Sequence, residues 1–120
     1  MAEHIDLGKR GEQIAKEYLQ KKGYKILKSN YRVGNAEVDL IAEYKRQTIF
    51  IEVKTRMQSK FGTPELAVTQ EKRRNMKKVA RGYIQHNKLQ GEVRFDIISI
   101  TFSNKNDYEL MHFDDAFFLR

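Results

Sequence analysis

The most constraining feature of this sequence is a pair of apolar segments separated by four polar residues. Residues 36–43 and 48–55 are each rich in β-branched and apolar side chains, and the polar cluster 44–47 lies between them. Two such segments around a short polar cluster are typical of an antiparallel β-hairpin. Because neither Lys45 nor Arg46 is a preferred two-residue turn former, we expect a four-residue loop between the strands.

The register of this hairpin brings four charged residues together. With the turn centred on the polar cluster, Asp39 lies opposite Glu52, and Glu37 lies opposite Lys54. Because side chains alternate along a strand, all four are expected on one face of the sheet. The other face is then apolar, and its residues are Val38, Leu40, Ala42, Ile49, Ile51 and Val53.

The pairing of Asp39 with Glu52 predicts a bound cation. Directly opposed residues have Cβ atoms about 5 Å apart, and like charges at that separation destabilise a sheet. Mg²⁺ and Mn²⁺ favour carboxylate oxygens and water as ligands, so one of these ions is the expected cofactor. The alternative is an ion pair between Glu37 and Lys54 with both acids exposed, which accounts for Lys54 but not for the acid pair.

Length and charge narrow the class of protein. The 120 residues (1–120) are enough for a single domain. There are 23 Lys and Arg residues against 16 Asp and Glu, and the formal charge of +7 is spread along the chain. Such a balance favours a polyanionic partner, nucleic acid above all, although a merely soluble basic protein is the alternative.

Several classes of protein are not expected. The chain has no cysteine, which excludes disulfides, zinc–thiolate sites and thiol catalysis. His4, His86 and His112 are scattered, with no partner at metal-ligand spacing, so a histidine-based nuclease is not expected. The sequence shows no apolar leader and no run that could span a bilayer, so we expect a cytoplasmic protein with no membrane partner.

The first helix is expected to carry a third carboxylate. Residues 6–22 have helical periodicity, with Asp6 as a candidate N-cap and Gly23 as the residue that ends the helix. Glu12 lies on the inward side of this helix, where it can join the acid pair. The alternative is a first-turn acid that interacts with the helix dipole.

The second helix is expected to carry a basic surface. It starts with Thr63 as N-cap and Pro64 at the first helical position and runs to about Asn87, with a break near Val68. Lys72 lies on its buried stripe, so we expect that side chain to point toward the acids. Its other basic residues suit phosphates, or form a solvated surface. The candidate nucleic-acid-binding residues are Arg56, Lys72, Arg73, Arg74, Lys77, Lys78 and Arg81.

The order of elements predicts an α/β domain, a mixed sheet of about five strands flanked by helices. Besides the hairpin, strands are expected at 24–32, 94–102 and 108–119, with a loop at 55–63. Asp96 is expected half-buried near the start of a strand, in a structural pair with Arg94 or a helix end.

The acidic residues and Lys54 are the parts of metal-dependent phosphodiester hydrolysis. Asp39 and Glu52, joined by Glu12, can hold a hydrated divalent ion that lowers the pKa of a bound water and polarises a phosphoryl oxygen. Lys54 can place a positive charge against the attacking water or the developing phosphate charge.

This arrangement resembles the PD-(D/E)xK nuclease superfamily and is similar to archaeal Holliday junction resolvases. A closer resemblance, to the bacterial YraN family, covers nearly the whole chain. It rests on Gly11-Glu12, Gly23-Tyr24, residues 37–41 and 50–56, Phe61-Gly62 and residues 94–96. The resemblance implies a restriction-endonuclease-like core with Mg²⁺ on Asp39, Glu52 and the Val53 carbonyl. It also implies that Lys54 is the catalytic lysine and Glu12 an auxiliary metal ligand. Val38 stands where the superfamily's name has proline.

Three functions follow from these observations. The favoured one is a nuclease that cuts DNA, structured or branched DNA included, with Mg²⁺ or Mn²⁺. Because the superfamily includes members that bind without cutting, a non-catalytic module that binds DNA or RNA is the main alternative. The third is an RNA- or ribosome-associated basic protein. Cutting a junction would require two active sites and hence a homodimer, whose interface could use Phe117, Phe118 and Leu119; these residues could equally cap the core.

Overall fold

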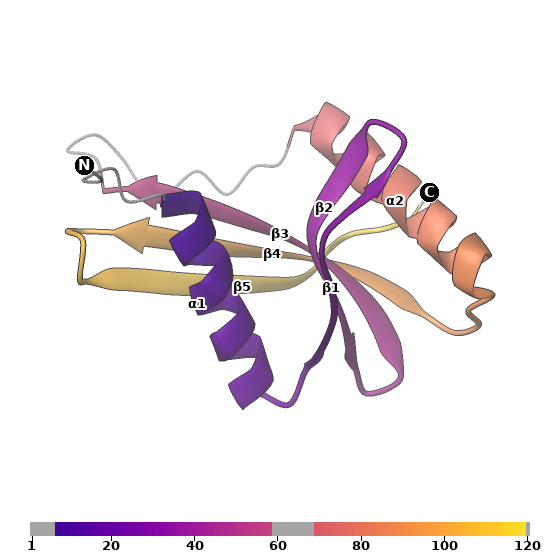
Figure 1. The fold of residues 1–120 in the computed structure, drawn as a ribbon, viewed down its shortest axis with the longest axis horizontal. Helices are drawn as coiled ribbons and strands as arrows, with labels where there is room; N and C mark the ends of the chain where they lie inside the picture. Colours follow the sequence, from indigo (N-terminus) through magenta and orange to yellow (C-terminus); the bar gives the residue numbers. More distant parts are fainter. Residues whose placement is uncertain (1–6, 59–68, 120) are drawn as a thin grey trace.

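A five-stranded mixed sheet with one helix on each face makes up the part of the chain that the computed structural model describes, residues 7–58 and 69–119. The elements are α1 (Leu7–Lys21), β1 (Lys25–Val33), β2 (Ala36–Tyr44), β3 (Gln47–Met57), α2 (Gln70–Asn87), β4 (Val93–Phe102) and β5 (Tyr108–Phe117). The strands lie in sequence order, and all neighbours are antiparallel except β3 and β4 (Figure 1). The expected fold class is therefore confirmed.

The central hairpin has the expected register but a tighter turn. Its ladder runs from Leu40–Ile51 to Tyr44–Gln47, as the sequence predicts. The four-residue loop is wrong, because Lys45 and Arg46 alone make the turn, with φ of 50° and 68°. Two successive positive φ angles are the signature of a type I′ turn, whose twist matches that of the flanking strands.

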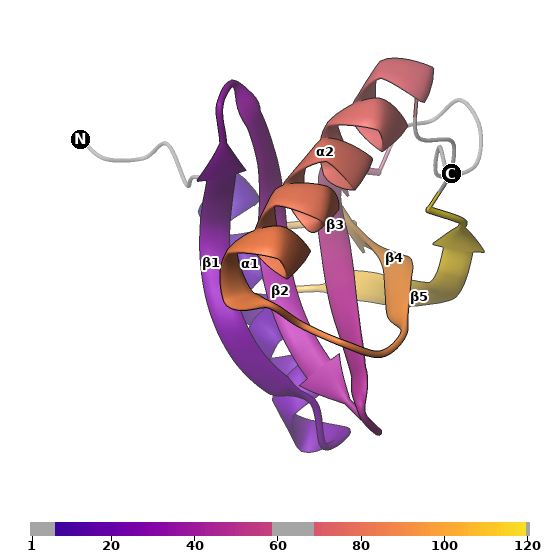
Figure 2. The ribbon, with the colours of Figure 1, turned by 90° about the vertical axis from the view of Figure 1, so that its right-hand side faces the viewer.

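The two faces of the sheet hold separate hydrophobic cores. Leu40, Ala42, Ile49 and Ile51 share one face, as predicted, and belong to the core under α1. Val38 instead belongs to the core under α2, so its predicted place on the face of Leu40 is wrong. Regular alternation therefore fails around Asp39, between these two residues. Figure 2 shows the two helices on opposite faces of the twisted sheet.

The helix ends differ in part from the sequence prediction. Gly23, with φ of 98°, follows α1 and allows the Tyr24 amide to donate to the Leu19 carbonyl, as in a Schellman cap. The Thr69 hydroxyl accepts from the Lys72 amide at 3.1 Å, so α2 has its N-cap where a break was expected. Neither described helix is long and apolar enough to cross a membrane. The predicted Asp6 cap, the Thr63-Pro64 start and Val68 lie outside the described residues.

The strand ends also show two differences. The third strand extends to Met57, so the loop predicted to start at Thr55 begins too early. At the C-terminus, Phe117 is only 9% exposed and packs in the core, whereas Phe118 is 70% exposed. Phe117 thus caps the core, and the two residues do not form one exposed surface.

Gly11 sets how closely α1 approaches β3, which leads to a first prediction. A Cβ at this position would collide with the Thr55 side chain. We expect Gly11→Ala to lower the free energy of unfolding by about 1–3 kcal/mol, although alanine favours helices. Gly8→Ala, at an exposed position of the same helix, is the matched control. Urea denaturation checks both, and Thr55→Ala should rescue Gly11→Ala; an undiminished stability of Gly11→Ala would contradict this packing.

Candidate active site

The acidic residues lie where β2 parts from β3. The β2–β3 ladder of the described residues ends at Leu40–Ile51, while β2 stays paired with β1 as far as Ala36. Figure 1 shows the tip of the β1–β2 hairpin turning away from β3. Beyond the ladder, a side chain and not the backbone of β2 bonds to β3: the Asp39 Oδ2 accepts a hydrogen bond from the Val53 amide at 2.8 Å. The carboxylate is therefore held against β3 beside Glu52.

Glu52 is a buried carboxyl group whose charge is only partly balanced. Its side chain is 13% exposed, and Oε2 lies 3.1 Å from the Lys72 Nζ of α2. Oε1 is buried and has no hydrogen-bond partner among the described residues. Burial, followed by the Asp39 charge, raises the pKa of Glu52 to about 8, against the opposing effect of Lys72. Two carboxylates that repel each other thus lie close together, as the sequence predicts, but not as the directly opposed ladder pair that was expected, because the ladder ends at Leu40–Ile51.

Glu12 approaches the same acids from the other helix. It is half-buried on α1 and accepts a hydrogen bond from the Asn30 Nδ2 at 3.3 Å. Burial raises the pKa of Glu12, and the Asp39 charge raises it further. Asn30 has a φ of 53°, an unusual value for a strand residue, which directs its side chain locally. The structure therefore brings Glu12 into the electrostatic field of Asp39.

Lys54 and Ser99 are neighbours in the parallel ladder, two positions beyond Glu52. Lys54 is half-buried, and its position two residues after Glu52 gives both side chains the same face of the sheet. Ser99 is 2% exposed, and its Oγ has no hydrogen-bond partner among the described residues. Ser99 thus adds a hydroxyl group beside Lys54 near the acid pair, a neighbour that sequence reasoning did not anticipate.

The residues present suit a divalent ion that keeps several water ligands better than one whose ligands are all protein side chains. No three His, Cys, Asp or Glu side chains of the described chain form a metal-binding group. Asp39 and Glu52 are then the direct side-chain ligands available. Mg²⁺ commonly binds one or two carboxylates and keeps several water ligands, some of which phosphate oxygens can replace. The unpartnered Glu52 Oε1 is an open position for such a cation.

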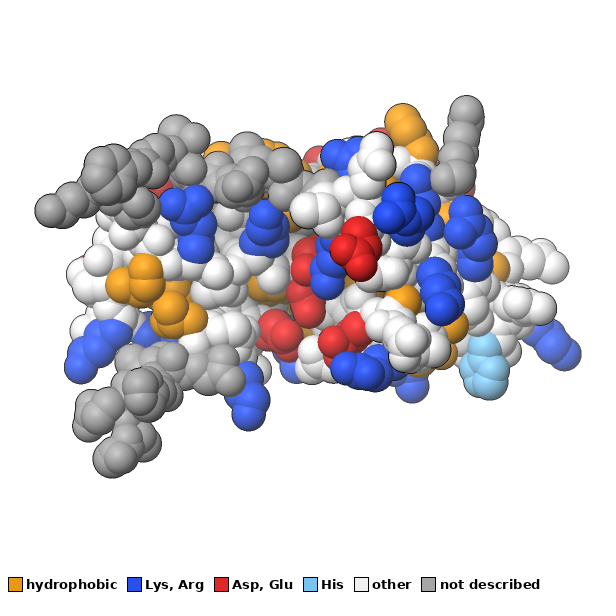
Figure 3. Space-filling model, turned by 90° about the horizontal axis from the view of Figure 1, so that it is seen from above, with side chains coloured by type: hydrophobic (Ala, Val, Ile, Leu, Met, Phe, Trp, Pro, Cys, Tyr) orange, Lys and Arg blue, Asp and Glu red, His pale blue; other side chains and the backbone are white. Residues whose placement is uncertain are grey.

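The basic residues predicted to bind nucleic acid lie at different places in the structure. Lys72 pairs with Glu52 and so differs from the other candidate phosphate-binding residues. Three more line one shallow cavity with Gln70. Lys78 lies against the β1–β2 turn at Gly34. The members of the cavity group are Arg73, Arg74 and Lys77; Arg81 is exposed farther along the helix, and Arg56 is half-buried on β3. Figure 3 shows acidic side chains in the middle of this side of the molecule and Lys and Arg side chains toward α2.

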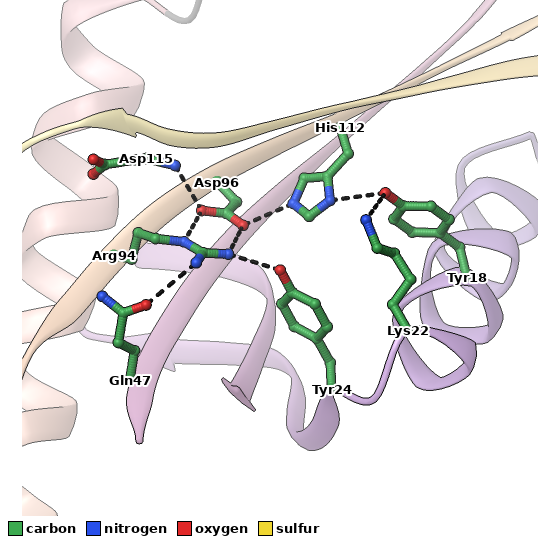
Figure 4. Close-up of polar contacts among 8 residues, drawn as sticks. All are labelled: Tyr18, Lys22, Tyr24, Gln47, Arg94, Asp96, His112 and Asp115. Carbon is green, nitrogen blue, oxygen red and sulfur yellow. Dashed lines mark hydrogen bonds and ion pairs between the residues drawn. The ribbon is translucent and has the colours of Figure 1, made fainter. Parts of the chain in front are cut away.

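A second polar cluster, centred on Asp96, was only partly anticipated. Asp96 is fully buried and forms the predicted pair with Arg94, whose Nε and Nη2 donate to it at 2.8 and 2.7 Å (Figure 4). It also accepts from the His112 ring, at 2.7 Å from Nε2, and from the Asp115 amide at 3.0 Å. The other ring nitrogen, Nδ1, lies 3.0 Å from the Tyr18 hydroxyl. Three elements of the fold, β4, β5 and α1, therefore meet at the Asp96 carboxylate or at its His112 partner.

The role of His112 was missed at the sequence level. Burial alone would raise the pKa of Asp96, but hydrogen bonds from His112, Arg94 and Asp115 lower it below its ordinary value. A signal was present, because His112 follows Leu110 by two residues and so shares its core-facing side. The polar cluster stabilises the join between β4, β5 and α1.

The raised pKa of Glu52 predicts how the stability of the metal-free protein depends on pH. Between its ordinary value of 4.5 and about 8, the folded protein binds more protons than the unfolded chain. The free energy of unfolding therefore falls as the pH rises through this range, by up to about 5 kcal/mol, and levels off above it. Glu52→Gln should remove this fall. Urea denaturation in the presence of a chelator measures stability against pH for the wild type and for Glu52→Gln. If both proteins lost stability equally over this pH range, the raised pKa of Glu52 would be contradicted.

The structure is an α/β domain with a mixed sheet and a half-buried pair of carboxylates where two strands diverge. A family model described as "Uncharacterised protein family UPF0102" matches residues 11–100. The chain belongs to this family, which is the one that the YraN resemblance indicated.

Relatives of nearly equal length support this membership. A UPF0102 protein of Flavobacterium psychrophilum is 42% identical over 118 residues, 98% of each chain. One of Thermodesulfovibrio yellowstonii is 46% identical over 114 residues, 95% of this chain and 97% of the relative. Among solved structures, Pyrococcus furiosus SfsA in complex with Ca²⁺ is similar with a TM-score of 0.45 and 16% identity, over 90% of this chain and 62% of that one.

Proposed function

We propose that this protein is a metal-dependent nuclease that hydrolyses phosphodiester bonds of DNA. The observation that carries the proposal is the pair Asp39 and Glu52. Glu52 is buried, has a pKa raised to about 8 and keeps an unpartnered oxygen beside a second carboxylate. Folding of such a pair costs free energy that a bound cation would recover, and perturbed carboxyl groups of this kind cluster at functional sites.

The chain's own residues divide the work of the proposed reaction. Asp39, Glu52 and the Val53 carbonyl would hold Mg²⁺ or Mn²⁺, with Glu12 reaching it through water. When bound, the ion activates a water and polarises the phosphoryl oxygen. The Val53 amide fixes the Asp39 carboxylate by donating to it at 2.8 Å. Lys54 supplies positive charge where the phosphate charge develops.

The basic cavity on α2 supports nucleic acid as the binding partner. Arg73, Arg74 and Lys77 line one cavity, and they follow Lys72, which contacts Glu52. Phosphates bound along α2 would therefore lie next to the acid pair. Binding of this kind is independent of base sequence and weakens steeply with salt.

One observation favours the alternative of a non-catalytic nucleic-acid-binding module. The Lys72 ammonium already lies 3.1 Å from Glu52, so a fixed positive charge partly fulfils the role of a metal ion. In that case the acids are structural, and neither metal binding nor cleavage accompanies DNA binding. In the nuclease, Glu52 would hold the ion and Lys72 would be available to pair with a phosphate.

Nicking of supercoiled plasmid and of branched or single-stranded DNA tests the proposal. The purified protein should cleave in Mg²⁺ or Mn²⁺ and not in chelator. Lys54→Met should reduce the cleavage rate by roughly 10²–10³-fold while leaving metal binding in place, because the lost charge acts on the transition state. Lys105→Met, in an exposed turn, is the matched control. Metal-dependent cleavage by Lys54→Met at the wild-type rate would remove Lys54 from the mechanism.

A further inference from the structure

A cavity of about 380 Å³ opens beside the acid pair, on the face of the sheet that α2 partly covers. It is lined by Arg73 of α2, Ile97 of β4 and residues 112–114, 116 and 117 of β5, and is called the β5 cavity below. Cavities of this size are typical of small-molecule and nucleotide sites. We infer that the β5 cavity holds an unpaired base of a DNA strand whose phosphates lie on α2; this inference rests on the proposed function.

The strand registers place the cavity next to Glu52. Glu52 is level with Ile97 in the β3–β4 ladder, and Ile97 is level with Phe113 in the β4–β5 ladder. Residues level with one another on adjacent strands point to the same face, and adjacent strands are about 4.8 Å apart. The cavity wall therefore begins one strand from the acid pair, and Phe113 lies two strands from it.

The side of the cavity that Ile97 and Phe113 form is apolar and belongs to neither core. Ile97 is 5% exposed and Phe113 is half-buried, yet neither belongs to the hydrophobic core under α1 or to that under α2. Phe117, the deeper wall, is stacked on Phe95 with ring centroids 4.8 Å apart. A half-buried phenylalanine beside a cavity offers a ring face for stacking, and every base has a face that can stack on it.

A bulge in β5 shapes the cavity, and the polar cluster holds the bulge. Between the pairs Ile97–Phe113 and Phe95–Phe117, β5 has two more residues than β4. The extra length includes Asp115, whose φ of 55° lies in the left-handed region that aspartate adopts more readily than most residues. Its amide donates to the buried Asp96 carboxylate at 3.0 Å (Figure 4). Bulges of this kind are common beside active sites, where they redirect side chains.

The charges around the cavity favour a nucleotide, which carries a phosphate, over an uncharged aromatic ligand. The guanidinium of Arg73 and the ammonium of Lys77 lie 5.5 and 5.8 Å from the Phe117 ring centroid. Arg73 also lines the basic cavity on α2, so it joins a phosphate surface to an aromatic wall. The exposed Asp114 adds a carboxylate that can accept from a base amino group. A nucleotide, in which one sugar links a phosphate to a base, therefore matches both the phosphate-binding surface and the aromatic wall.

This occupant restricts the substrate. Bases in a duplex are stacked and paired, so a base can enter a side cavity only where the strand is single or has been opened, at an end, a gap or a branch. The substrate class is therefore DNA with unpaired nucleotides next to the bond that is cut, and an intact duplex is bound only through its phosphates.

Fluorescence anisotropy in chelator tests this inference without cleavage. The probes are a labelled single-stranded oligonucleotide and a duplex of equal length. Phe113→Ala should weaken single-strand binding about tenfold, because one stacked base is lost, and should leave duplex binding unchanged. Phe118→Ala, at a residue that is 70% exposed and outside the cavity, is the matched control. Phe113→Leu, which keeps an apolar side chain of similar size, should show the same loss.

The results separate this inference from the proposed function. Unchanged single-strand affinity in folded Phe113→Ala or Phe113→Leu overturns the base site, as does an equal loss for single strand and duplex. Wild-type protein that binds the single strand no better than the duplex also overturns it. The proposed function depends instead on cleavage in Mg²⁺ or Mn²⁺, so a protein that binds single strands through Phe113 but never cuts would keep the base site and lose the nuclease.

Discussion

Asp39→Asn is expected to reduce metal-dependent DNA cleavage by roughly 10³-fold or more, because a ligand of the catalytic ion is worth several kcal/mol in the transition state. Asparagine is the informative substitution. Its side-chain oxygen can still accept from the Val53 amide, which Asp39 Oδ2 does at 2.8 Å in the native protein. The local structure is then kept while the negative charge is removed, and the nicking assay measures the loss.

The controls for Asp39→Asn separate catalysis from folding and binding. Glu43→Gln changes an exposed acid of the same strand and should leave cleavage intact. DNA affinity of Asp39→Asn in chelator should match the wild type, since phosphate binding depends on α2. A folded Asp39→Asn that cuts DNA at the wild-type rate would show that the acid pair is not the catalytic centre.

Asp96→Asn is expected to cause the largest loss of stability, about 3–5 kcal/mol. Asp96 is fully buried and balances Arg94, whose side chain is 12% exposed. Asparagine leaves this guanidinium without a counter-charge and turns an amide donor toward groups that already donate. Because stabilities of single domains are typically about 5–15 kcal/mol, the loss would be a large fraction of the total.

Urea denaturation and thermal melting measure the effect of Asp96→Asn. Glu109→Gln, an exposed acid on β5, is the control and should change stability by less than about 0.5 kcal/mol. A stability of Asp96→Asn close to that of Glu109→Gln would mean that the cluster with Arg94 and His112 contributes little to folding. Lost single-strand affinity in folded Asp96→Asn would further agree with its hold on the β5 bulge.

The central hairpin was predictable from the sequence because its signals are local. Alternating β-branched residues fix which residues face each other, and the register from Leu40–Ile51 to Tyr44–Gln47 follows from the position of the polar cluster. The same logic put Asp39 beside Glu52. On α2, helical periodicity alone predicted that Lys72 points toward the acids, and it lies 3.1 Å from Glu52.

The features of the hairpin that were not predicted from the sequence depend on the twist of the folded sheet. Lys45 and Arg46 adopt positive φ because the strands' twist selects a type I′ turn over the residues' own preference. The divergence of the β1–β2 tip from β3 moves Val38 to the other core and ends the ladder before Asp39. Where β2 is no longer paired with β3, it does not keep the regular alternation that the sequence predicts.

The polar cluster and the β5 cavity escaped prediction for a different reason. His112 is separated by 94 residues from Tyr18 and by 16 from Asp96, so only the folded sheet brings the three together. The cavity depends on a bulge around Asp115, and no preference of that residue predicts two extra positions in one strand. Long-range pairing and an irregular ladder leave weak traces in a single sequence.

Calorimetric titration with Mg²⁺ and Mn²⁺ tests the central claim, that Asp39 and Glu52 form a metal site. The wild type should bind one ion, and both Asp39→Asn and Glu52→Gln should lose binding while their circular dichroism spectra and thermal unfolding show folded proteins. Asp107→Asn, in the exposed turn before β5, should bind as the wild type does. No metal binding by the wild type, with or without DNA, would contradict the account and favour the alternative in which Lys72 balances Glu52.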